Sequence, residues 1–187
     1  FIYSNCRQPG NHKLRELPAG SIILFGSRKA DRFVLDTVFV VDGSAPARYL
    51  IGERPDLEVP EELTLLVFDA LATDPGAPRR ECTVYRGATF AESYHGCYSF
   101  VPARPFDDQD PWFERPPIEA RPYVNPTLVM AARVTSASPQ EAVEVWTAVR
   151  DTVLSHGLVL GVQIEMPGRG LIPEAPVEQH VAQRGGC

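Results

Sequence analysis

The two residues whose spacing most directly permits chemistry are His95 and Cys97. Side chains at positions i and i+2 of a strand point to the same face, so these two could form a Cys/His dyad. In such a dyad the imidazole activates the thiol as a nucleophile. The competing interpretation is that Cys97 is a buried structural cysteine, because unbridged cysteines are among the most buried residues.

Paired carboxylates are a second possible source of chemistry, since they can act as a general acid and a general base. The candidates are Glu92, Asp107, Asp108, Asp110 and Glu114. A solvated acidic loop explains the same residues. The four histidines show no H-E-x-x-H or H-x-E spacing, and the cysteines show no CxxC spacing. The sequence therefore predicts no metal site and no cofactor.

Charge is distributed unevenly along the 187 residues. The net charge of −6 argues against a protein that coats nucleic acid over its whole surface. Residues 1–50 hold seven Lys/Arg and four Asp/Glu, a net of +3, whereas residues 51–187 hold eleven and twenty, a net of −9. We therefore expect a polyanion to meet the N-terminal third of the chain.

A β-hairpin is the strongest structural feature of the sequence. An apolar, β-branched run at 21–27 follows the turn Pro18-Ala19-Gly20 and is expected to be a buried strand. A polar turn at 28–31 leads to a return strand at 32–41, a long, mainly apolar run that is broken by Asp36. Such a hairpin is either buried on both faces or curled into a barrel.

The remaining elements alternate strands with two expected helices. Ser138 and Glu141 form a capping box with Pro139 at the first helical position, and Gly157 ends the helix that they begin. A second helix is predicted at 60–71, although the short apolar run at 64–68 is also compatible with a strand. Residues 102–126, rich in Pro and aromatic residues, are expected to form an ordered surface loop. Further strands are predicted at 1–4, 82–90, 96–101, 127–135 and 158–165.

This order predicts an α+β fold, a small mixed or antiparallel barrel with helices packed outside it. Residues 1–165 are expected to form a single domain, and residues 166–187, rich in Pro and Gly, a flexible tail. No apolar run reaches the roughly 18 residues that a membrane helix needs. With four dispersed cysteines, we expect reduced thiols and a cytoplasmic location without a membrane partner.

The turn and strand at 17–27, Leu-Pro-Ala-Gly-Ser-Ile-Ile-Leu-Phe-Gly-Ser, resemble the PUA-like superfamily, which includes EVE and ASCH domains. The Asp usual after the Gly of that pattern is Ser21 here. The segments at 3–7 and 96–102 are also similar to nucleotide-modification-associated families. The resemblance implies a PUA-like barrel with a pocket for one flipped or unpaired base, and no chemistry need follow.

A base pocket needs aromatic rings for stacking, polar groups for the base edge and cations for the neighbouring phosphates. The stacking candidates are Tyr3, Phe25, Tyr98, Phe100 and Trp112. The candidates for reading the base edge are Ser4, Asn5, Ser27 and Ser99. The candidates for phosphate contacts are Arg7, Arg28, Lys29 and Arg32.

Three functions are compatible with these patterns. The first is a module that recognises an unmodified or modified base of DNA or RNA, in a cleft between the hairpin and the strand that carries Tyr98. The second is a small enzyme acting on nucleotides through the Cys/His or carboxylate groups. The third is an interaction domain that docks a partner chain on the loop at 102–126.

Overall fold

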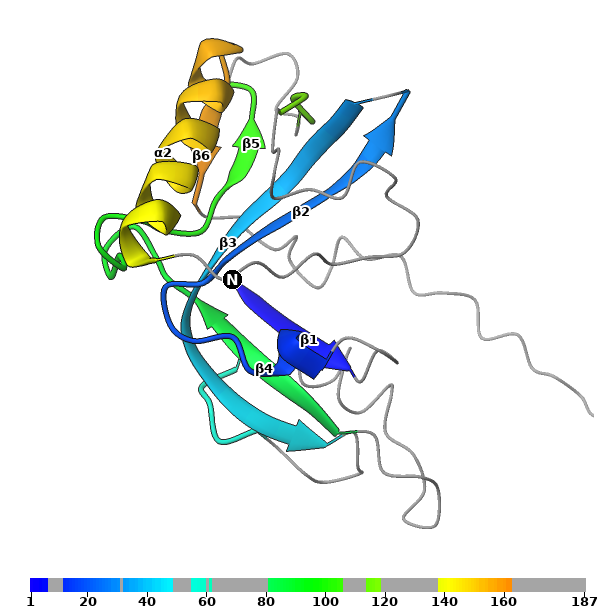
Figure 1. Cartoon of the computed structure of the whole chain (residues 1–187), viewed down its shortest axis with the longest axis vertical. Helices are drawn as coiled ribbons and strands as arrows, with labels where there is room; N and C mark the ends of the chain where they lie inside the picture. The colour runs from blue at the N-terminus through cyan, green and yellow to red at the C-terminus, as the bar shows by residue number, and fades with distance from the viewer. Residues whose placement is uncertain are drawn as a thin grey trace, which may run out of the picture.

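The computed structural model describes residues 1–6, 12–30, 32–48, 55–59, 61, 81–105, 114–118 and 138–162. Its elements are β1 (Ile2–Cys6), the 3-10 helix η1 (His12–Arg15), β2 (Ile22–Lys29), β3 (Arg32–Arg48), β4 (Glu81–Gly87), β5 (Val101–Ala103), α2 (Pro139–Ser155) and β6 (Val159–Gly161). The first four strands form one sheet in the order β1-β4-β3-β2, and β5 pairs with β6 (Figure 1). All four strand pairings are antiparallel, so the described part of the chain is α+β.

β3 is one of the two inner strands of the sheet and has different partners along its length. Its first half pairs with β2, from Lys29↔Arg32 to Ile22↔Val40. Its second half pairs with β4, beginning at Val41↔Gly87. The register shifts between Val41 and Gly43, and a bulge of this kind bends a strand. Figure 1 shows the resulting curve of β3 from the hairpin into the β4 region.

The edge of β3 that faces away from β2 is also hydrogen-bonded. Val38 exchanges two backbone bonds with Phe100, each 2.9 Å long. Further bonds to β3 on this side run from Leu35 N to Pro116 O (2.9 Å), from Ile118 N to Phe33 O (3.0 Å) and from Ala88 N to Val40 O (2.7 Å). Three separate segments of the chain therefore pair with the first half of β3 opposite β2.

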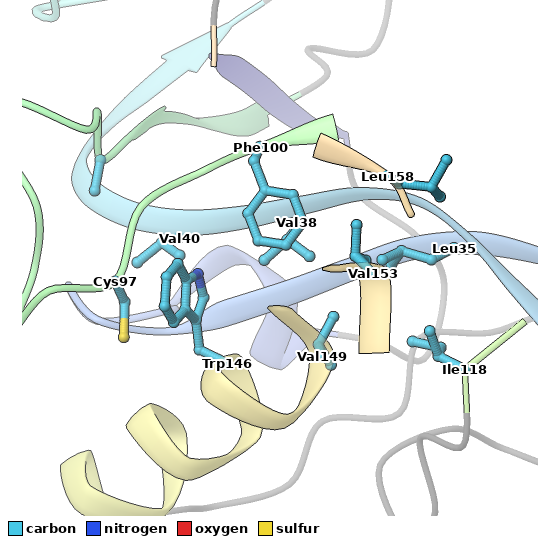
Figure 2. Packing of buried hydrophobic residues seen from close by; sticks show 11 residues of the cluster. Leu35, Val38, Val40, Cys97, Phe100, Ile118, Trp146, Val149, Val153 and Leu158 are labelled. Carbon is cyan, nitrogen blue, oxygen red and sulfur yellow. The ribbon is translucent and has the colours of Figure 1, made fainter. Parts of the chain in front are cut away.

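The main core lies between this part of β3 and α2 (Figure 2). Val38 and Phe100 face Trp146, Val149 and Val153 of the helix, and all five side chains are buried. The helix begins as its sequence predicts: the Ser138 hydroxyl accepts a bond from Glu141 N (3.2 Å), and Ser138 N donates to the Glu141 carboxylate (2.6 Å). The helix ends before Gly157, whose φ of 73° lies in the left-handed region that glycine adopts without strain.

An aromatic cluster fills the opposite face of the curved sheet. The ring of Tyr3 in β1 lies 5.0 Å from that of Phe25 in β2, and Phe39 and Tyr85 complete the cluster. Because β1 and β2 are the two outer strands of the sheet, this contact shows how far the sheet curls. The described strands nevertheless form no closed barrel, since β1 and β2 are not paired with each other.

The predicted hairpin is confirmed, but its burial is not. In β2, Ile22–Phe25 are half-buried and Gly26–Lys29 are exposed, because neither a helix nor another strand covers that end among the described residues. The prediction of a strand at 96–101 is wrong. Residues Tyr94–Cys97 form a tight turn, and the regular strand is Val101–Ala103, which includes Pro102 paired with Leu160.

Other predictions fall on residues outside the described part of the chain. These are the helix at 60–71 apart from Glu61, the strand at 127–135, most of the loop at 102–126 and the tail at 166–187. The strand predicted at 82–90 is confirmed as far as Gly87, where β4 ends, and residues 88–90 lie beyond it. Of the strand predicted at 158–165, the structure describes Val159–Gly161 as β6.

Tyr85 fixes the segment before β2 onto the sheet. Its buried hydroxyl donates to Leu14 O (2.9 Å) and accepts from Leu17 N (3.2 Å). Burial raises the pKa of this phenol above its ordinary value of 10.0. The neutral form is therefore favoured in the folded protein, and its contribution to stability is complete below pH 10 and declines as the pH rises through the folded-state pKa.

We expect Tyr85→Phe to lower the free energy of unfolding by about 1–3 kcal/mol at pH 7, because two buried polar groups lose a partner. The difference from the unchanged protein should shrink above pH 10, where the unfolded phenol ionises first. Urea unfolding at pH 7, 9 and 10.5 measures both effects. Tyr98→Phe is the control, since Tyr98 contacts its neighbours through its ring; equal losses in the two variants would contradict the assignment.

Candidate nucleic-acid interface

The tip of the β2–β3 hairpin carries an exposed group of cations. Lys29 is paired with Arg32, and Ala30 in the intervening turn has a positive φ of 55°. Arg28 Nε donates to Ala30 O at 3.0 Å. The side chains of Arg28, Lys29 and Arg32 are all exposed. A chain of net charge −6 thus presents three cationic side chains within five positions of one turn.

Arg115 joins this tip from a distant part of the sequence. Its guanidinium forms an ion pair with Asp36 and donates to the Ser27 hydroxyl. Asp36 is the extra residue of a β-bulge, because Phe25 pairs with Thr37 whereas Gly26 pairs with Leu35. The bulge interrupts the alternation of strand faces at this acidic residue. Both partners of the ion pair are more than a third exposed, so the pair itself adds about 0–1 kcal/mol to stability.

A second exposed feature, which we call the aromatic step, consists of Phe90 and Tyr98. Phe90 is 66% exposed, and its ring centre lies 5.1 Å from that of Tyr98, edge to face. Tyr98 in turn lies 5.0 Å from Trp146, whose indole N–H donates to Tyr98 O at 2.9 Å. The guanidinium of Arg150 lies over the Trp146 ring, 5.4 Å from its centre. The exposed Phe90 thus packs on Tyr98, which in turn packs on the buried Trp146.

The hairpin tip and the aromatic step are well separated. The segment that carries the step is hydrogen-bonded to Val38, and the β3 stretch from Val38 to Arg32 measures about 20 Å at roughly 3.3 Å per residue. The hairpin and the Tyr98–Phe100 segment are bonded directly to each other through Val38 and Phe100. The predicted cleft between them is therefore occupied by the sheet itself.

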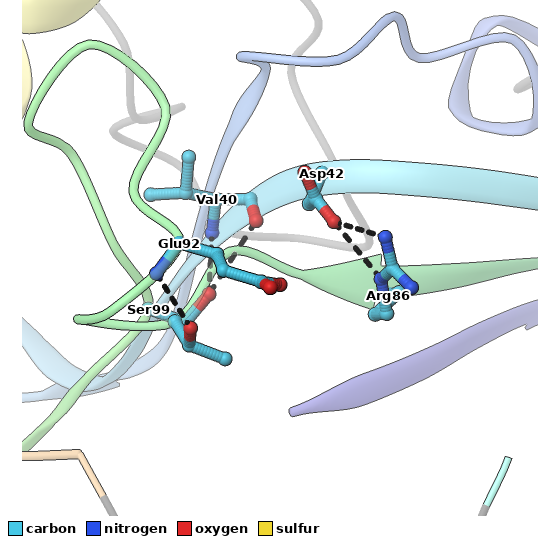
Figure 3. A network of polar contacts seen from close by, with 6 residues as sticks. Val40, Asp42, Arg86, Glu92 and Ser99 are labelled. Carbon is cyan, nitrogen blue, oxygen red and sulfur yellow. Dashed lines mark hydrogen bonds and ion pairs between the residues drawn. The ribbon is translucent and has the colours of Figure 1, made fainter. Parts of the chain in front are cut away.

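Ser99 and Phe100, two predicted contacts of the base, are core residues. Phe100 is completely buried against Trp146. The Ser99 hydroxyl is also buried and accepts a bond from Val40 N at 3.0 Å, in the place where β3 lacks a backbone partner (Figure 3). Figure 3 also shows the Arg86–Asp42 pair close to the bend of β3. Ser99 thus completes the sheet, and neither residue faces a ligand.

The other predicted contacts divide into three groups. Tyr3 and Phe25 are packed in the aromatic cluster, and Ser4 is half-buried in β1. Ser27, Arg28, Lys29 and Arg32 are brought together at the hairpin tip. Arg7, Trp112 and the side chain of Asn5 lie outside the described part of the structure.

His95 and Cys97 are not placed as a dyad. Tyr94 and Cys97 exchange backbone hydrogen bonds of 2.8 and 2.9 Å, and His95 and Gly96 both have positive φ values, 51° and 81°. These features define a two-residue hairpin turn of the primed type, in which the alternation of strand faces does not apply. His95 is exposed and its ring contacts that of Tyr94, whereas Cys97 is buried. Burial raises the pKa of the Cys97 thiol, which disfavours the nucleophilic thiolate.

Within the described ranges, no three His, Cys, Asp or Glu side chains are grouped so that they could hold a metal ion. Among those same residues, no helix has the length and apolar character needed to cross a membrane.

Sequence reasoning missed two residues of these surfaces, Phe90 and Arg115. Phe90 was included in a strand, although it follows the polar Thr89 at the point where β4 has already ended. Arg115 gave no signal, since Arg is abundant in the chain and the residue lies in a Pro-rich segment far from the hairpin in the sequence.

No family model, curated protein or solved structure matches the chain.

We expect Cys97 to react with iodoacetamide at least about tenfold more slowly in the folded protein than in urea at the same pH, because its thiol is buried and its pKa is raised. Peptide mass spectrometry at several reaction times gives the rate. Rapid alkylation of the folded protein at pH 7 would contradict this description and restore Cys97 as a candidate nucleophile.

Proposed function

We propose that this protein binds nucleic acid, with the β2–β3 hairpin tip as its contact to the phosphate backbone. The observation that carries the proposal is the exposed group Arg28, Lys29 and Arg32, with Arg115 beside it, on a chain whose net charge is −6. Cations that neutralise phosphates release counterions, which supplies most of the sequence-independent affinity for nucleic acid. A two-stranded ribbon also has the dimensions of an element that enters the major groove.

The aromatic step supplies the second half of the proposal, recognition of an unpaired base. Every base has a π-face, and stacking on an aromatic side chain contributes about 1–3 kcal/mol per base. Phe90 is exposed for such stacking, and Tyr98 supports it from below. Because β3 extends about 20 Å from Arg32 at the tip to Val38, which is bonded to the segment that carries the step, we expect the ligand to be a strand of several nucleotides. The resemblance to PUA-like domains supports a base-reading role, and the identity of the base, unmodified or modified, is the object of the binding experiment.

The enzyme alternative has less support from the described residues. Cys97 is buried with a raised pKa, and His95 points to solvent from a turn. Of the carboxylates, Glu114 is paired with Arg104 at 2.7 Å. Asp107, Asp108 and Asp110 lie outside the described residues, as does most of the loop proposed for partner binding.

Replacing Arg28 and Lys29 together by Gln should weaken binding to single- and double-stranded oligonucleotides roughly tenfold to a hundredfold at low salt. The slope of log Kd against log salt should fall by about two, one for each lost phosphate contact. Fluorescence anisotropy at several salt concentrations measures both quantities. Arg104→Glu, which changes the net charge by the same amount, is the matched control. If the control weakens binding equally, the effect is one of overall charge and the hairpin is the wrong site.

Phe90→Ala should weaken binding of single strands by about 1–3 kcal/mol, roughly 5- to 150-fold in Kd, with an unchanged salt slope. Its effect on Tm should be small, because the ring is mostly exposed. Leu154→Ala in α2 is the control, since it removes another exposed apolar side chain. A set of oligonucleotides carrying different modified bases then shows whether Phe90 contributes to base preference. Unchanged affinity of Phe90→Ala for every oligonucleotide would remove the aromatic step from the proposal.

A further inference from the structure

Two of the four cysteines lie directly opposite each other in the sheet. The antiparallel register of β1 and β4 runs without interruption from Ile2↔Arg86 to Cys6↔Cys82. The two residues are far apart in the sequence, so no local spacing such as CxxC indicates their proximity. Their pairing is a property of the fold alone.

The type of this pair follows from the hydrogen bonds at the other end of β1. Gly87 N donates to Phe1 O at 2.9 Å, so Phe1 and Gly87 form a hydrogen-bonded pair. Hydrogen-bonded and non-hydrogen-bonded pairs alternate along an antiparallel ladder. In an uninterrupted register Cys6 and Cys82 are therefore a non-hydrogen-bonded pair. In such pairs the two Cα atoms are about 4.5 Å apart. Disulfides join residues whose Cα atoms are about 4.4–6.8 Å apart, so this separation is compatible with a disulfide.

Both positions lie on the same face of the sheet. Ile2 packs against Cys82 and Val84, so the even-numbered positions of β1 share the face of that cluster. Cys6 is an even-numbered position of the same strand, and Cys82 is buried. This face is the one opposite to Tyr3 and the aromatic cluster, so a bond between the two positions would leave that cluster in place.

We infer that Cys6 and Cys82 are a site of disulfide formation with a low-molecular-weight disulfide such as glutathione disulfide. One cysteine thiolate attacks the glutathione disulfide, forming a mixed disulfide and releasing one glutathione thiolate. The second cysteine thiolate displaces the other glutathione and closes the Cys6–Cys82 bond. The two thiol protons pass to the two glutathione thiolates, so two cysteines are oxidised and one disulfide is reduced.

Because of the position of the pair, the disulfide would link the end of an outer strand, β1, to its neighbour β4. β1 is at the edge of the four-stranded sheet, and Cys6 is its last residue. Local opening of this end of the strand makes the pair accessible to the oxidant without unfolding of the inner strands. In the reducing compartment that the sequence predicts, the dithiol form dominates, and the bond forms when the glutathione pool becomes oxidised.

The test uses the whole chain incubated with glutathione disulfide, blocked with N-ethylmaleimide and digested with trypsin without reduction. The expected product is residues 1–7 joined to residues 81–86, with the loss of two hydrogen atoms. The Tm should rise by about 5–10 °C on oxidation, since the bond closes a long loop. Cys6→Ser should abolish both the linked peptide and the Tm shift, whereas Cys187→Ser should keep both.

Two results would overturn the inference. One is that Cys6 and Cys82 are recovered only as N-ethylmaleimide or glutathione adducts after prolonged oxidation. The other is that the linked peptides contain Cys97 or Cys187. Because Cys6→Ser changes an outer strand and leaves the buried Cys82 in place, urea unfolding of this variant in the reduced state verifies that it is folded. Neither result bears on binding at the hairpin tip, so this inference and the proposed function can fail separately.

Discussion

The pairing of β3 along both edges is the constraint on which the other described features depend. Buried backbone N–H and C=O groups must be hydrogen-bonded, and β3 carries a long row of them through the centre of the molecule. The hydrogen-bond partners of these groups are β2, β4 and the segments at Ala88, Phe100 and 116–118. Where no backbone group reaches Val40 N, the Ser99 hydroxyl takes its place. These bonds hold Phe100 under Trp146, and they bring Arg115 to the hairpin. Core packing and the arrangement of the candidate surfaces therefore share one cause.

The same constraint determines which surfaces can bind a ligand. Phe100 is hydrogen-bonded to the edge of β3, so the described backbone leaves no gap between the hairpin and this segment. Among the described residues, the two candidate surfaces lie where the ladder ends, at the tip of β2 and β3, and where the chain leaves it, as at Phe90 after β4. Cations and an aromatic ring therefore occupy separate places, which favours an extended ligand over a single nucleotide. A continuous strand of nucleic acid has the charge and the length for such an arrangement.

Local signals in the sequence predicted local structure well and contacts between distant segments poorly. The capping box at Ser138 and the stop at Gly157 each depend on a few neighbouring residues, and both are confirmed. The hairpin at 21–41 was predicted for the same reason, but the exposure of its tip depends on what packs beside it, and alternation of residue types does not record that. Tyr98–Phe100 was expected to be strand because its residues favour that state. A turn of the primed type at His95-Gly96 precedes it, with His in a position more usual for Asn or Asp. Arg115 and the pair Cys6–Cys82 follow only from the register of the sheet.

Backbone conformations that are unfavourable for non-glycine residues occur at the two candidate surfaces. Among the described residues, the non-glycine residues with positive φ are Ala30, at the hairpin tip, and His95, in the loop between Phe90 and Tyr98. Each costs of the order of 1 kcal/mol relative to a glycine or a relaxed backbone. Phe90 is the most exposed large apolar side chain of the described residues and lies in that same loop. The main core, by contrast, has its buried polar atoms satisfied in the described part of the chain. Proteins tend to accept such costs where a surface is used for binding, and they restrict them elsewhere. The distribution of strain thus agrees with the distribution of charge and exposed aromatic area, although the three arise from different physical causes.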